Sequence, residues 1–173
     1  MTDHERSAGR PLPALRFNVG MRRVVVLGRG GAGKSTLAVD LGAALGLEVV
    51  ELDKLFWRPD LRPTPKDRWA ATQRGLCAGE RWVLDGDLGP YDVLAARLPA
   101  ADTVVVLDFA LWRCAWRALR RSRENRAFWH WLVTYRRRGL PAVMAAVAEH
   151  ANRAELHVLR NPRAVERFRR RWR

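Results

Sequence analysis

Short apolar runs alternate with segments of helical periodicity along most of the chain. The apolar runs lie at residues 23–27, 48–52, 82–85, 103–108 and 156–159, and Val and Leu dominate them. Each run is short enough to form a buried strand of a parallel sheet. Because helical patterns separate the runs, the order of elements predicts an α/β domain whose mainly parallel sheet lies between layers of helices.

The segments between these strands carry the signals of helix ends. Gly46 is expected as the C-cap of the first helix. Thr64 is expected to cap the second helix, and Asn161 the last, with a proline at the first helical position in each case. Further helical segments are predicted at residues 36–45, 91–98, 109–126, 127–138 and 142–151.

Two pairs of residues are interpreted as packing rather than as chemistry. Trp112 and Trp116 stand four residues apart in a helical segment and therefore share one helix face, which is typical of core residues. Cys77 and Cys114 are isolated and lack the spacing of metal ligands. Two such thiols are most simply small buried hydrophobic groups.

Carboxylates follow three of the predicted strands. Asp53, Asp85 and Asp108 each stand where an apolar run ends. Ligands of open parallel sheets bind beyond the carboxyl ends of the strands, so all three side chains are expected to face one crevice. A single Asp in this position is often a turn or cap residue, but three at one edge favour a functional role.

Residues 28–36 form the strongest motif of the sequence. They read Gly-Arg-Gly-Gly-Ala-Gly-Lys-Ser-Thr, which matches the phosphate-binding P-loop (Walker A) pattern G-x-x-x-x-G-K-S. A strand precedes the motif and a helix follows it, so backbone N–H groups and a helix N-terminus can surround a phosphate. An ordinary glycine-rich turn would not need all these residues in register. The predicted nucleotide-binding residues are Gly28, Gly30, Gly31, Ala32, Gly33, Lys34, Ser35 and Thr36.

Composition and charge refine this interpretation. The 173 residues are 48% hydrophobic, which suits one globular domain, and no apolar run is long enough to span a membrane. The 32 Lys and Arg residues exceed the 18 Asp and Glu residues, giving a net charge of +14. The excess is concentrated in residues 117–138 and 160–173. It keeps open a second class of partner, a nucleic acid or another polyanion.

The N-terminal segment differs from the rest of the chain. Residues 1–20 contain prolines and glycines, show little periodicity, and are predicted to form a flexible extension before a domain at residues 21–173. The segment has no continuous apolar stretch of the kind found in signal peptides. A cytoplasmic location is therefore expected.

The motifs together resemble the small P-loop kinases related to adenylate kinase. More narrowly, the chain resembles a bacterial adenylate-kinase-like family often labelled DNA topology modulation protein. The resemblance implies a three-layer α/β/α P-loop NTPase with a five-stranded parallel sheet in the order 2-3-1-4-5 and a helical lid. The matching segments are residues 28–36, 52–57, 82–87, 101–109 and 158–163, together with Arg117 and Arg121.

The implied sheet order brings the third strand beside the P-loop strand. The resemblance therefore favours Asp85 over Asp108 as the carboxylate that holds Mg²⁺, with Ser35 as a metal ligand. Asp53 would lie at the acceptor site, where a carboxylate can orient or deprotonate a hydroxyl. Asp87 stands where the family more often has Asn, and this difference leaves the specificity for the acceptor open.

The resemblance also implies roles for arginines beyond the P-loop. Arg117 and Arg121 lie one helical turn apart and match lid arginines that stabilise charge on the transferred phosphoryl group. The lid would span about residues 120–138, and its closure would exclude water. Arg160 and Arg163 match a loop that packs on the adenine base.

The sequence thus predicts a Mg²⁺- and ATP-dependent phosphotransferase that acts on a small acceptor, such as a nucleotide or another small molecule. Lys34, Asp53, Asp85, Arg117 and Arg121 are the predicted catalytic residues. Two alternatives remain: a nucleotide-dependent protein that binds DNA or RNA through the arginine-rich lid and tail, and an ATPase without a small acceptor. The sequence leaves the acceptor and the oligomeric state open.

Overall fold

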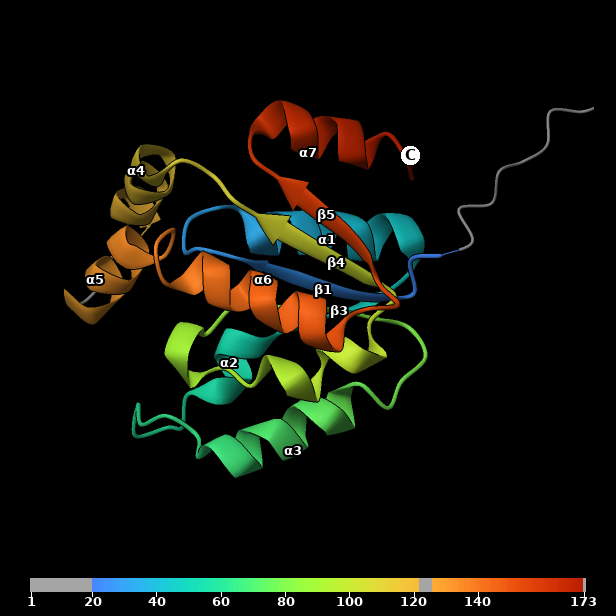
Figure 1. Cartoon of the computed structure of the whole chain (residues 1–173), viewed down its shortest axis with the longest axis horizontal. Helices are drawn as coiled ribbons and strands as arrows, with labels where there is room; N and C mark the ends of the chain where they lie inside the picture. The colour runs from blue at the N-terminus through green and yellow to red at the C-terminus, as the bar shows by residue number, and fades with distance from the viewer. Residues whose placement is uncertain (1–19, 122–125, 173) are drawn as a thin grey trace, which may run out of the picture.

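The computed structural model describes residues 20–121 and 126–172. The predicted N-terminal extension, apart from Gly20, lies outside the described residues. Four residues of the predicted lid, 122–125, also lie outside them. The described part of the chain contains a single five-stranded sheet with helices on both faces (Figure 1).

All neighbouring strands of the sheet are parallel, and their order is β2-β3-β1-β4-β5. The strands are β1 (Arg23–Gly28), β2 (Glu48–Glu51), β3 (Trp82–Asp85), β4 (Thr103–Leu107) and β5 (Glu155–Leu159). The predicted fold class and strand order are therefore confirmed. In β1, the central strand, the side chains from Val24 to Leu27 are fully buried. This burial explains why the strand reads as an uninterrupted apolar run.

Seven helices of the described residues surround this sheet. They are α1 (Lys34–Leu45), α2 (Leu52–Phe56), α3 (Lys66–Leu76), α4 (Leu111–Arg121), α5 (Arg126–Thr134), α6 (Gly139–His150) and α7 (Pro162–Arg169). Figure 1 shows α1 and α7 over one face of the sheet and α3 and α6 over the other. Helices α4 and α5 lie together beyond one end of the strands, so they flank the edge at which the P-loop begins.

Two hydrophobic cores hold these layers. On one face, Leu37 and Leu41 of α1 and Phe168 of α7 join the cluster that includes Val24 and Val26. On the other face, Phe56, Trp69 and Val143 belong to a cluster that includes Val25 and Leu27. Alternate residues of β1 therefore pack on opposite faces, as the pleat of a strand requires.

The predicted ends of two helices are confirmed. Gly46 follows α1 with a left-handed φ of 64°, a conformation that favours glycine at a helix C-terminus. The side chain of Asn161 caps α7 by accepting a hydrogen bond of 2.9 Å from the backbone N–H of Ala164. Pro162 occupies the first turn of that helix, where its missing N–H costs no intrahelical hydrogen bond.

The second strand is shorter than predicted. It ends at Glu51, and the backbone turns at once into the one-and-a-half turns of α2. Leu52 and Phe56 are four residues apart in this helix, and both are fully buried. Burying both side chains on one face favours the helix, and Asp53 therefore lies in its first turn rather than at the end of a strand.

The predicted helix over residues 91–98 is wrong. Three short 3₁₀ turns replace it: η1 (Gly89–Tyr91), η2 (Leu94–Ala96) and η3 (Leu98–Ala100). Pro90 and Pro99 each lie in the first residues of a turn, which breaks the chain into pieces too short for an α-helix. The turns connect β3 to β4 and border the functional site described below.

Helices in the second half also differ from the prediction. Helix α4 begins at Leu111 rather than at 109, and α6 begins at Gly139, three residues before the predicted start. Pro141 is accommodated because the first turn of a helix has unpaired N–H groups in any case. The interpretation of Trp112 and Trp116 as core residues is wrong, since 70% and 58% of their surfaces are exposed.

Candidate functional site

The P-loop connects the end of β1 to the start of α1. Gly28, Gly31 and Gly33 have φ angles of 136°, 73° and 96°, a region of backbone conformation that favours glycine. A Cβ atom at Gly31 would collide with the carbonyl of Cys114 in α4, so the loop packs directly on the backbone of that helix. The glycines therefore serve both the curvature of the loop and the close approach of α4.

Lys34 begins α1 and lies at the centre of the site. Its Nζ donates a hydrogen bond of 3.3 Å to the carbonyl of Arg29, back across the loop. Burial raises the pKa values of Asp53, Asp85 and Asp87, and the positive charge of Lys34 opposes this rise at all three carboxylates. The predicted lysine and the predicted carboxylates Asp53 and Asp85 are thus brought together, and Asp87 joins them.

A cavity of about 930 Å³ opens on the α7 side of the P-loop. Its walls come from the loop itself and from α1, α4 and α7, and include Thr36, Trp116, Arg117 and Arg163. Arg117 lies against the loop, with its Nη1 donating a hydrogen bond of 3.2 Å to the carbonyl of Ala32. A large, partly apolar hollow with guanidinium groups at its rim has the character of a nucleotide site.

Asp85 lies at the end of β3 beside the P-loop. Only 4% of its surface is exposed, and its Oδ1 has no hydrogen-bond partner among the described residues. Burial raises the pKa of Asp85, whereas Lys34 and a hydrogen bond from the Ser35 hydroxyl lower it. A buried carboxylate oxygen without a partner, next to a hydroxyl, fits the donor set of Mg²⁺.

The magnesium site would not be built from protein groups alone. The described residues contain no group of three or more His, Cys, Asp or Glu side chains arranged to hold a metal ion. Mg²⁺ commonly keeps several water ligands and binds through one or two protein groups together with substrate phosphates. Ser35 and Asp85 could supply those protein groups.

Asp53 is exposed to solvent, although neighbouring protein atoms surround its carboxylate closely enough to affect its pKa. Its carboxylate belongs to the first turn of α2. Burial raises the pKa of Asp53, Lys34 lowers it, and the charges of Asp85, Asp87 and Asp92 raise it further. Solvent access combined with a dense surrounding of protein atoms is expected for a group on the wall of a pocket, where a substrate can reach it.

Asp87 is a site residue whose position the sequence did not reveal. Its Oδ2 accepts a hydrogen bond of 2.7 Å from the Tyr135 hydroxyl, and its Oδ1 accepts one of 3.0 Å from the N–H of Gly89. Burial raises the pKa of Asp87, while Lys34 and these two hydrogen bonds lower it. Tyr135 follows α5 within the predicted lid, so its hydrogen bond connects the lid segment directly to Asp87.

Arg29 is buried inside the P-loop and supports the same contact. Only 2% of its surface is exposed, and its guanidinium lies 5.6 Å from the centroid of the Tyr135 ring. An arginine over an aromatic face is a favourable cation–π arrangement, which strengthens when it is shielded from water. The structure thus turns the Arg29 side chain toward Tyr135.

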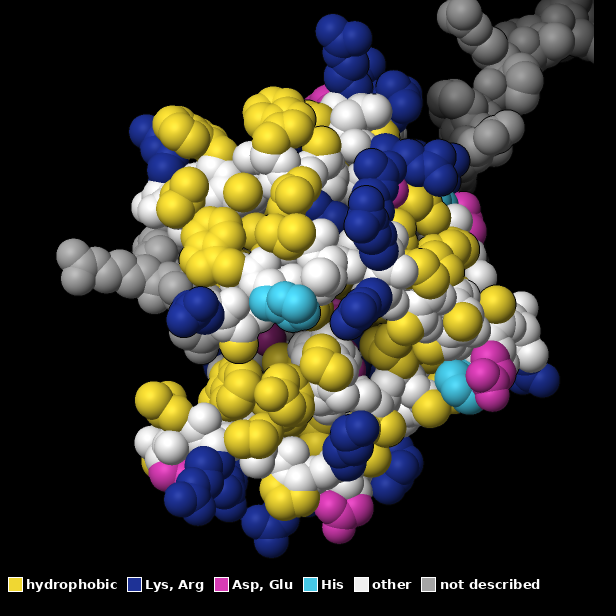
Figure 2. All heavy atoms as spheres, turned by 60° about the vertical axis from the view of Figure 1, so that its left-hand side comes forward, with side chains coloured by type: hydrophobic (Ala, Val, Ile, Leu, Met, Phe, Trp, Pro, Cys, Tyr) yellow, Lys and Arg dark blue, Asp and Glu magenta, His cyan; other side chains and the backbone are white. Residues whose placement is uncertain are grey.

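Aromatic side chains stand around these carboxylates. Trp57 follows α2, four residues beyond Asp53, and its ring centroid lies 6.0 Å from that of Tyr91 in η1. Trp131 of α5 packs on Gly89, and its indole N–H is buried without a hydrogen-bond partner in the described structure. Figure 2 shows hydrophobic side chains on both sides of a hollow, with an acidic side chain deep between them.

A fully buried ion pair supports the turns that border this hollow. Arg97 binds Asp92 through two hydrogen bonds of 2.7 and 2.8 Å, and its Nη2 also donates to the carbonyl of Gly86 at 2.8 Å. A further hydrogen bond joins it to Gln73 of α3. Burial alone would raise the pKa of Asp92, but the Arg97 guanidinium, together with hydrogen bonds from the backbone N–H groups of Leu88 and Val93, outweighs burial and holds the pKa below its ordinary value.

Asp108 lies on the opposite side of the P-loop strand from Asp85. Its Oδ2 is 3.5 Å from a guanidinium nitrogen of Arg136 and 3.8 Å from one of Arg160. Arg163 lines the cavity described above, whereas Arg160 instead faces Asp108. Arg121 is the last residue of α4, one turn after Arg117, and its side chain lies outside the described part of the structure.

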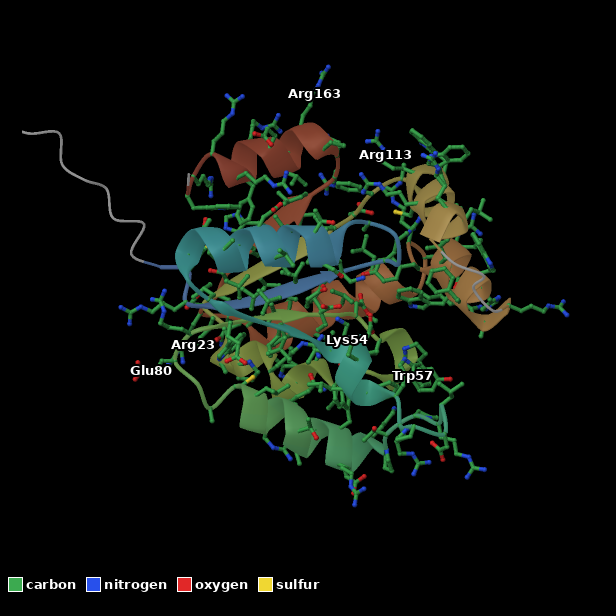
Figure 3. The ribbon with its side chains drawn as sticks, turned by 180° about the vertical axis from the view of Figure 1, so that it is seen from behind. Arg23, Lys54, Trp57, Glu80, Arg113 and Arg163 are labelled. Carbon is green, nitrogen blue, oxygen red and sulfur yellow. The ribbon has the colours of Figure 1, made fainter. Side chains whose placement is uncertain are left out.

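The candidate site therefore has two halves. Figure 3 shows Arg163 of α7 and Arg113 of α4 toward one side of the sheet, and Lys54 of α2 and Trp57, which follows α2, toward the other. The P-loop runs between the two. The cavity between α1, α4 and α7 is named the nucleotide half, and the region around Asp53, Asp87 and the aromatic side chains the acceptor half, after the roles proposed for them below.

Comparisons with family models and with curated protein sequences found no match. Among solved structures, the chain is similar to an unliganded sugar kinase from Janibacter sp. HTCC2649, with 21% identity, a TM-score of 0.57, and 88% of this chain and 94% of that chain covered. It is also similar to shikimate kinase from Acinetobacter baumannii in complex with shikimate, with 18% identity, a TM-score of 0.61, and coverage of 87% and 90%.

A shikimate kinase from Bacteroides thetaiotaomicron is similar over 88% of this chain and 96% of that chain, with 16% identity and a TM-score of 0.55. At such identities the likeness establishes a common fold, which is the α/β fold of P-loop kinases. A separate property of the described helices is that none of them is long and apolar enough to cross a membrane.

Proposed function

We propose that the protein is a Mg²⁺-dependent kinase that transfers the γ-phosphoryl group of ATP to a small acceptor. One observation carries the proposal: the P-loop residue Lys34 lies close enough to both Asp85 and Asp53 for its charge to affect their pKa values. Asp85 has an unpartnered oxygen and lies beside Ser35, and the carboxylate of Asp53 is accessible to solvent. Phosphoryl transfer requires a cation that binds the phosphates, a carboxylate that binds the metal ion, and a carboxylate that accepts the proton of the acceptor hydroxyl.

The nucleotide half suits ATP. The adenosine would occupy the 930 Å³ cavity, between Trp116 of α4 and Arg163 of α7. The triphosphate would follow the P-loop, where N–H groups and Lys34 meet its negative charge. Arg117, already held against the loop by its hydrogen bond to Ala32, would come close to the phosphates.

Ser35 and Asp85 would hold Mg²⁺, which neutralises phosphate charge when it is bound. The chain's own groups would then position the reaction. Lys34 would fix the β- and γ-phosphates, and Arg117 with Arg121 would stabilise the charge that spreads over the transferred group.

The transfer step assigned to Asp53 is a single displacement. An acceptor hydroxyl oxygen bonds to the γ-phosphorus while the bond from that phosphorus to the β–γ bridging oxygen breaks. ADP leaves with the electron pair of the broken bond. The hydroxyl proton passes to the Asp53 carboxylate, whose raised pKa brings it closer to the range of an effective general base.

The structural neighbours support the same class of reaction. They are a sugar kinase and shikimate kinases, one of which holds shikimate. All share with this chain the fold that sets a P-loop at the carboxyl ends of parallel strands. The narrower resemblance to the proteins labelled for DNA topology modulation adds no chemistry to this proposal.

The test is transfer of labelled phosphate from ATP to a panel of sugars, polyols, nucleosides and nucleotides, with ATP hydrolysis measured in parallel. Asp53→Asn should lower the transfer rate by about 10² to 10⁴, the range of general-base catalysis, with little change in ATP affinity. Asp67→Asn is the matched control, because Asp67 is an exposed carboxylate in the first turn of α3.

Hydrolysis without transfer to any acceptor would favour the alternative of a bare ATPase. Equal transfer by the Asp53 and Asp67 variants would remove the role assigned to Asp53. Absence of ATP binding by calorimetry, with magnesium present, would overturn the proposal as a whole.

Nucleic-acid binding remains a second candidate function. It is favoured by the exposed arginines of α7 and of the segment after α5, including Arg137, Arg138, Arg167 and Arg170. Binding through phosphates releases counterions, so the affinity for DNA or RNA should fall steeply as salt is raised. Absence of binding at about 0.15 M salt, the physiological ionic strength, would exclude this function.

A further inference from the structure

The exposed hydrophobic side chains of the protein gather at one end of the molecule. Among the described residues, eleven large hydrophobic side chains are exposed, and nine of them lie on α2, the loop after it, η1, α4 and α5. These segments follow the carboxyl ends of the strands, at the end where Figure 1 shows α4 and α5. Scattered exposed hydrophobic residues are normal, whereas a concentration of them indicates an interaction surface.

Helix α4 presents the most exposed part of this surface. Trp112 and Leu119 stand seven residues apart, so they lie two turns from each other on one side of the helix, and 70% and 65% of their surfaces are exposed. Cys114 and Ala118 lie on another face of α4 and are fully buried. Because that face packs on the core, Trp112 and Leu119 are held toward solvent. Trp116 also lies on their side of the helix, but it lines the cavity described above.

A second exposed hydrophobic group lies on the loop after α2. Leu61 is 80% exposed and has a φ of 59°, in the left-handed region that favours glycine. The loop is nevertheless closed by its own backbone, with hydrogen bonds from the N–H of Leu61 to the carbonyl of Arg58 at 2.8 Å and from the N–H of Arg58 to the carbonyl of Arg62 at 3.1 Å. The loop therefore holds an apolar side chain in water at some cost in backbone strain.

The charges around these hydrophobic groups are mostly positive. Residues 109–138, which include α4 and α5, contain nine arginines and one acidic residue, Glu124. The guanidinium of Arg113 lies 5.3 Å from the centroid of the Trp112 ring. Arg58 and Arg62 flank Leu61 and share the carboxylate of Asp60, at 3.5 and 3.7 Å. Figure 2 brings this end forward and shows hydrophobic side chains interspersed with Lys and Arg.

A surface that is both apolar and cationic suits a bilayer with anionic headgroups. Tryptophan is favoured at the boundary between headgroups and acyl chains, and arginine is attracted to the lipid phosphates. A nucleic acid supplies negative charge, but it has no apolar layer for aliphatic side chains such as Leu61 and Leu119. A second copy of this chain would bring one arginine-rich surface against another, and like charges repel.

We infer that α4 and the loop after α2 dock the protein on an anionic membrane surface. Trp112, Leu119 and Leu61 enter the boundary between headgroups and acyl chains, while Arg113 and the neighbouring arginines contact lipid phosphates. The contact is peripheral, because only side chains enter the bilayer. It would form whether or not the protein transfers phosphate, since these three hydrophobic side chains belong to neither half of the candidate site.

The test is co-sedimentation of the full chain with two kinds of vesicle, one of phosphatidylcholine and one of an equimolar mixture of phosphatidylcholine and phosphatidylglycerol. The protein should bind the mixed vesicles more tightly, and binding should weaken as salt is raised, because salt screens the attraction of the arginines. Brominated phosphatidylcholine in the same vesicles should quench tryptophan fluorescence, and Trp112→Ala should reduce this quenching.

Variants locate the contact on the molecule. Trp112→Ala, Leu119→Ala and Leu61→Ala should each weaken binding to the mixed vesicles by roughly three- to tenfold, since each removes a side chain that enters the bilayer. Val39→Ala is the matched control, because Val39 is 56% exposed on α1, outside the segments that carry this surface. All four variants should keep the thermal stability and the ATP affinity of the unchanged protein.

Other outcomes would overturn the inference. One is absence of binding to the mixed vesicles at about 0.15 M salt, the physiological ionic strength. Equal binding by all variants without quenching would reduce the contact to a general attraction of a cationic protein. Loss of DNA or RNA binding in the Trp112 and Leu119 variants, with vesicle binding unchanged, would assign the surface to nucleic acid. A lower molecular mass of Trp112→Ala in solution would assign it to a second copy of the chain.

Discussion

The two halves of the site differ in charge and in origin. The nucleotide half is lined by arginines, among them Arg117 and Arg163, and its loop comes from one continuous motif. The acceptor half gathers Asp53, Asp87 and aromatic side chains from four separate segments: α2, the turn after β3, η1 and α5. Under the proposed function, the difference means that phosphate binding would be encoded by one local motif, whereas acceptor recognition would depend on tertiary structure.

The largest effect is expected for Lys34→Ala, because Lys34 belongs to the P-loop and also lies close to the carboxylates of the acceptor half. Removing its ammonium group should lower the rate of phosphoryl transfer on the order of 10³-fold, since one positioned charge is worth that much in a transition state. It should also weaken ATP binding, as measured by calorimetry. A variant with near-normal turnover would show that the P-loop lysine has no catalytic function here.

A change to Tyr135 should act on the acceptor half alone. Tyr135→Phe removes the hydroxyl that donates to Asp87 at 2.7 Å and leaves a buried carboxylate with fewer partners. A hydrogen bond to a charged group contributes about 1.5–3 kcal/mol, so the free energy of unfolding should fall by that amount. Chemical denaturation measures the loss, and ATP affinity should stay constant. A matching loss of ATP affinity would break the division between the halves.

The nucleotide half has its own aromatic group in Trp116, which lines the cavity with 58% of its surface exposed. Stacking of a base on an aromatic ring contributes about 1–3 kcal/mol, so Trp116→Ala should weaken ATP binding by roughly tenfold. The KM for the acceptor should not change. Intrinsic fluorescence titrated with ATP provides the readout, and identical affinities before and after the change would place the base elsewhere.

The smallest expected effect is the response to pH, which again separates the halves. Burial raises the pKa of Asp53 above the ordinary 3.8, so its carboxylate keeps a proton to a higher pH than an exposed Asp would. Transfer needs the deprotonated form, and its rate should therefore fall on acidification before the pH reaches 3.8. ATP binding measured without magnesium should change less than the rate.

The raised pKa values also affect stability. Because the folded state of the nucleotide-free protein holds the protons of Asp53, Asp85 and Asp87 more tightly than the unfolded state, these groups favour folding at pH values below the raised pKa. Their contribution is lost as the pH rises through it. Asp92, with its lowered pKa, has the opposite effect and loses its stabilising contribution as the pH falls.

The predictable part of the molecule follows from periodicity and a short motif. The apolar runs predicted the strands most clearly for β1, β3 and β4, which are buried on both faces. Residues 28–36 located the P-loop because its chemistry needs consecutive residues. The position of Asp85 beside Ser35 followed from the strand order that the resemblance implied. These features depend on local sequence or on a common fold.

The remaining features depend on contacts between distant segments. Asp87 and Tyr135 are 48 residues apart, and no local pattern pairs them. Trp116 was interpreted as a core residue because its spacing with Trp112 is equally typical of a buried face and of an exposed one beside a cavity. Residues 91–98 were predicted to form a helix, but Pro90 and Pro99 divide this part of the chain into short turns. The ion pair of Arg97 and Asp92 that supports the turns was not visible in the sequence.

That ion pair bears on which residues of this region can be replaced. Arg97 and Asp92 are buried in the interior, whereas the rings of Trp57 and Tyr91 lie at the surface. The residues that support the turns and the residues that the turns expose are thus different. Libraries of variants should accept many side chains in place of the two rings without loss of the fold, while Arg97 and Asp92 should tolerate almost no replacement, since removing one partner leaves an uncompensated charge at a cost of about 3–5 kcal/mol.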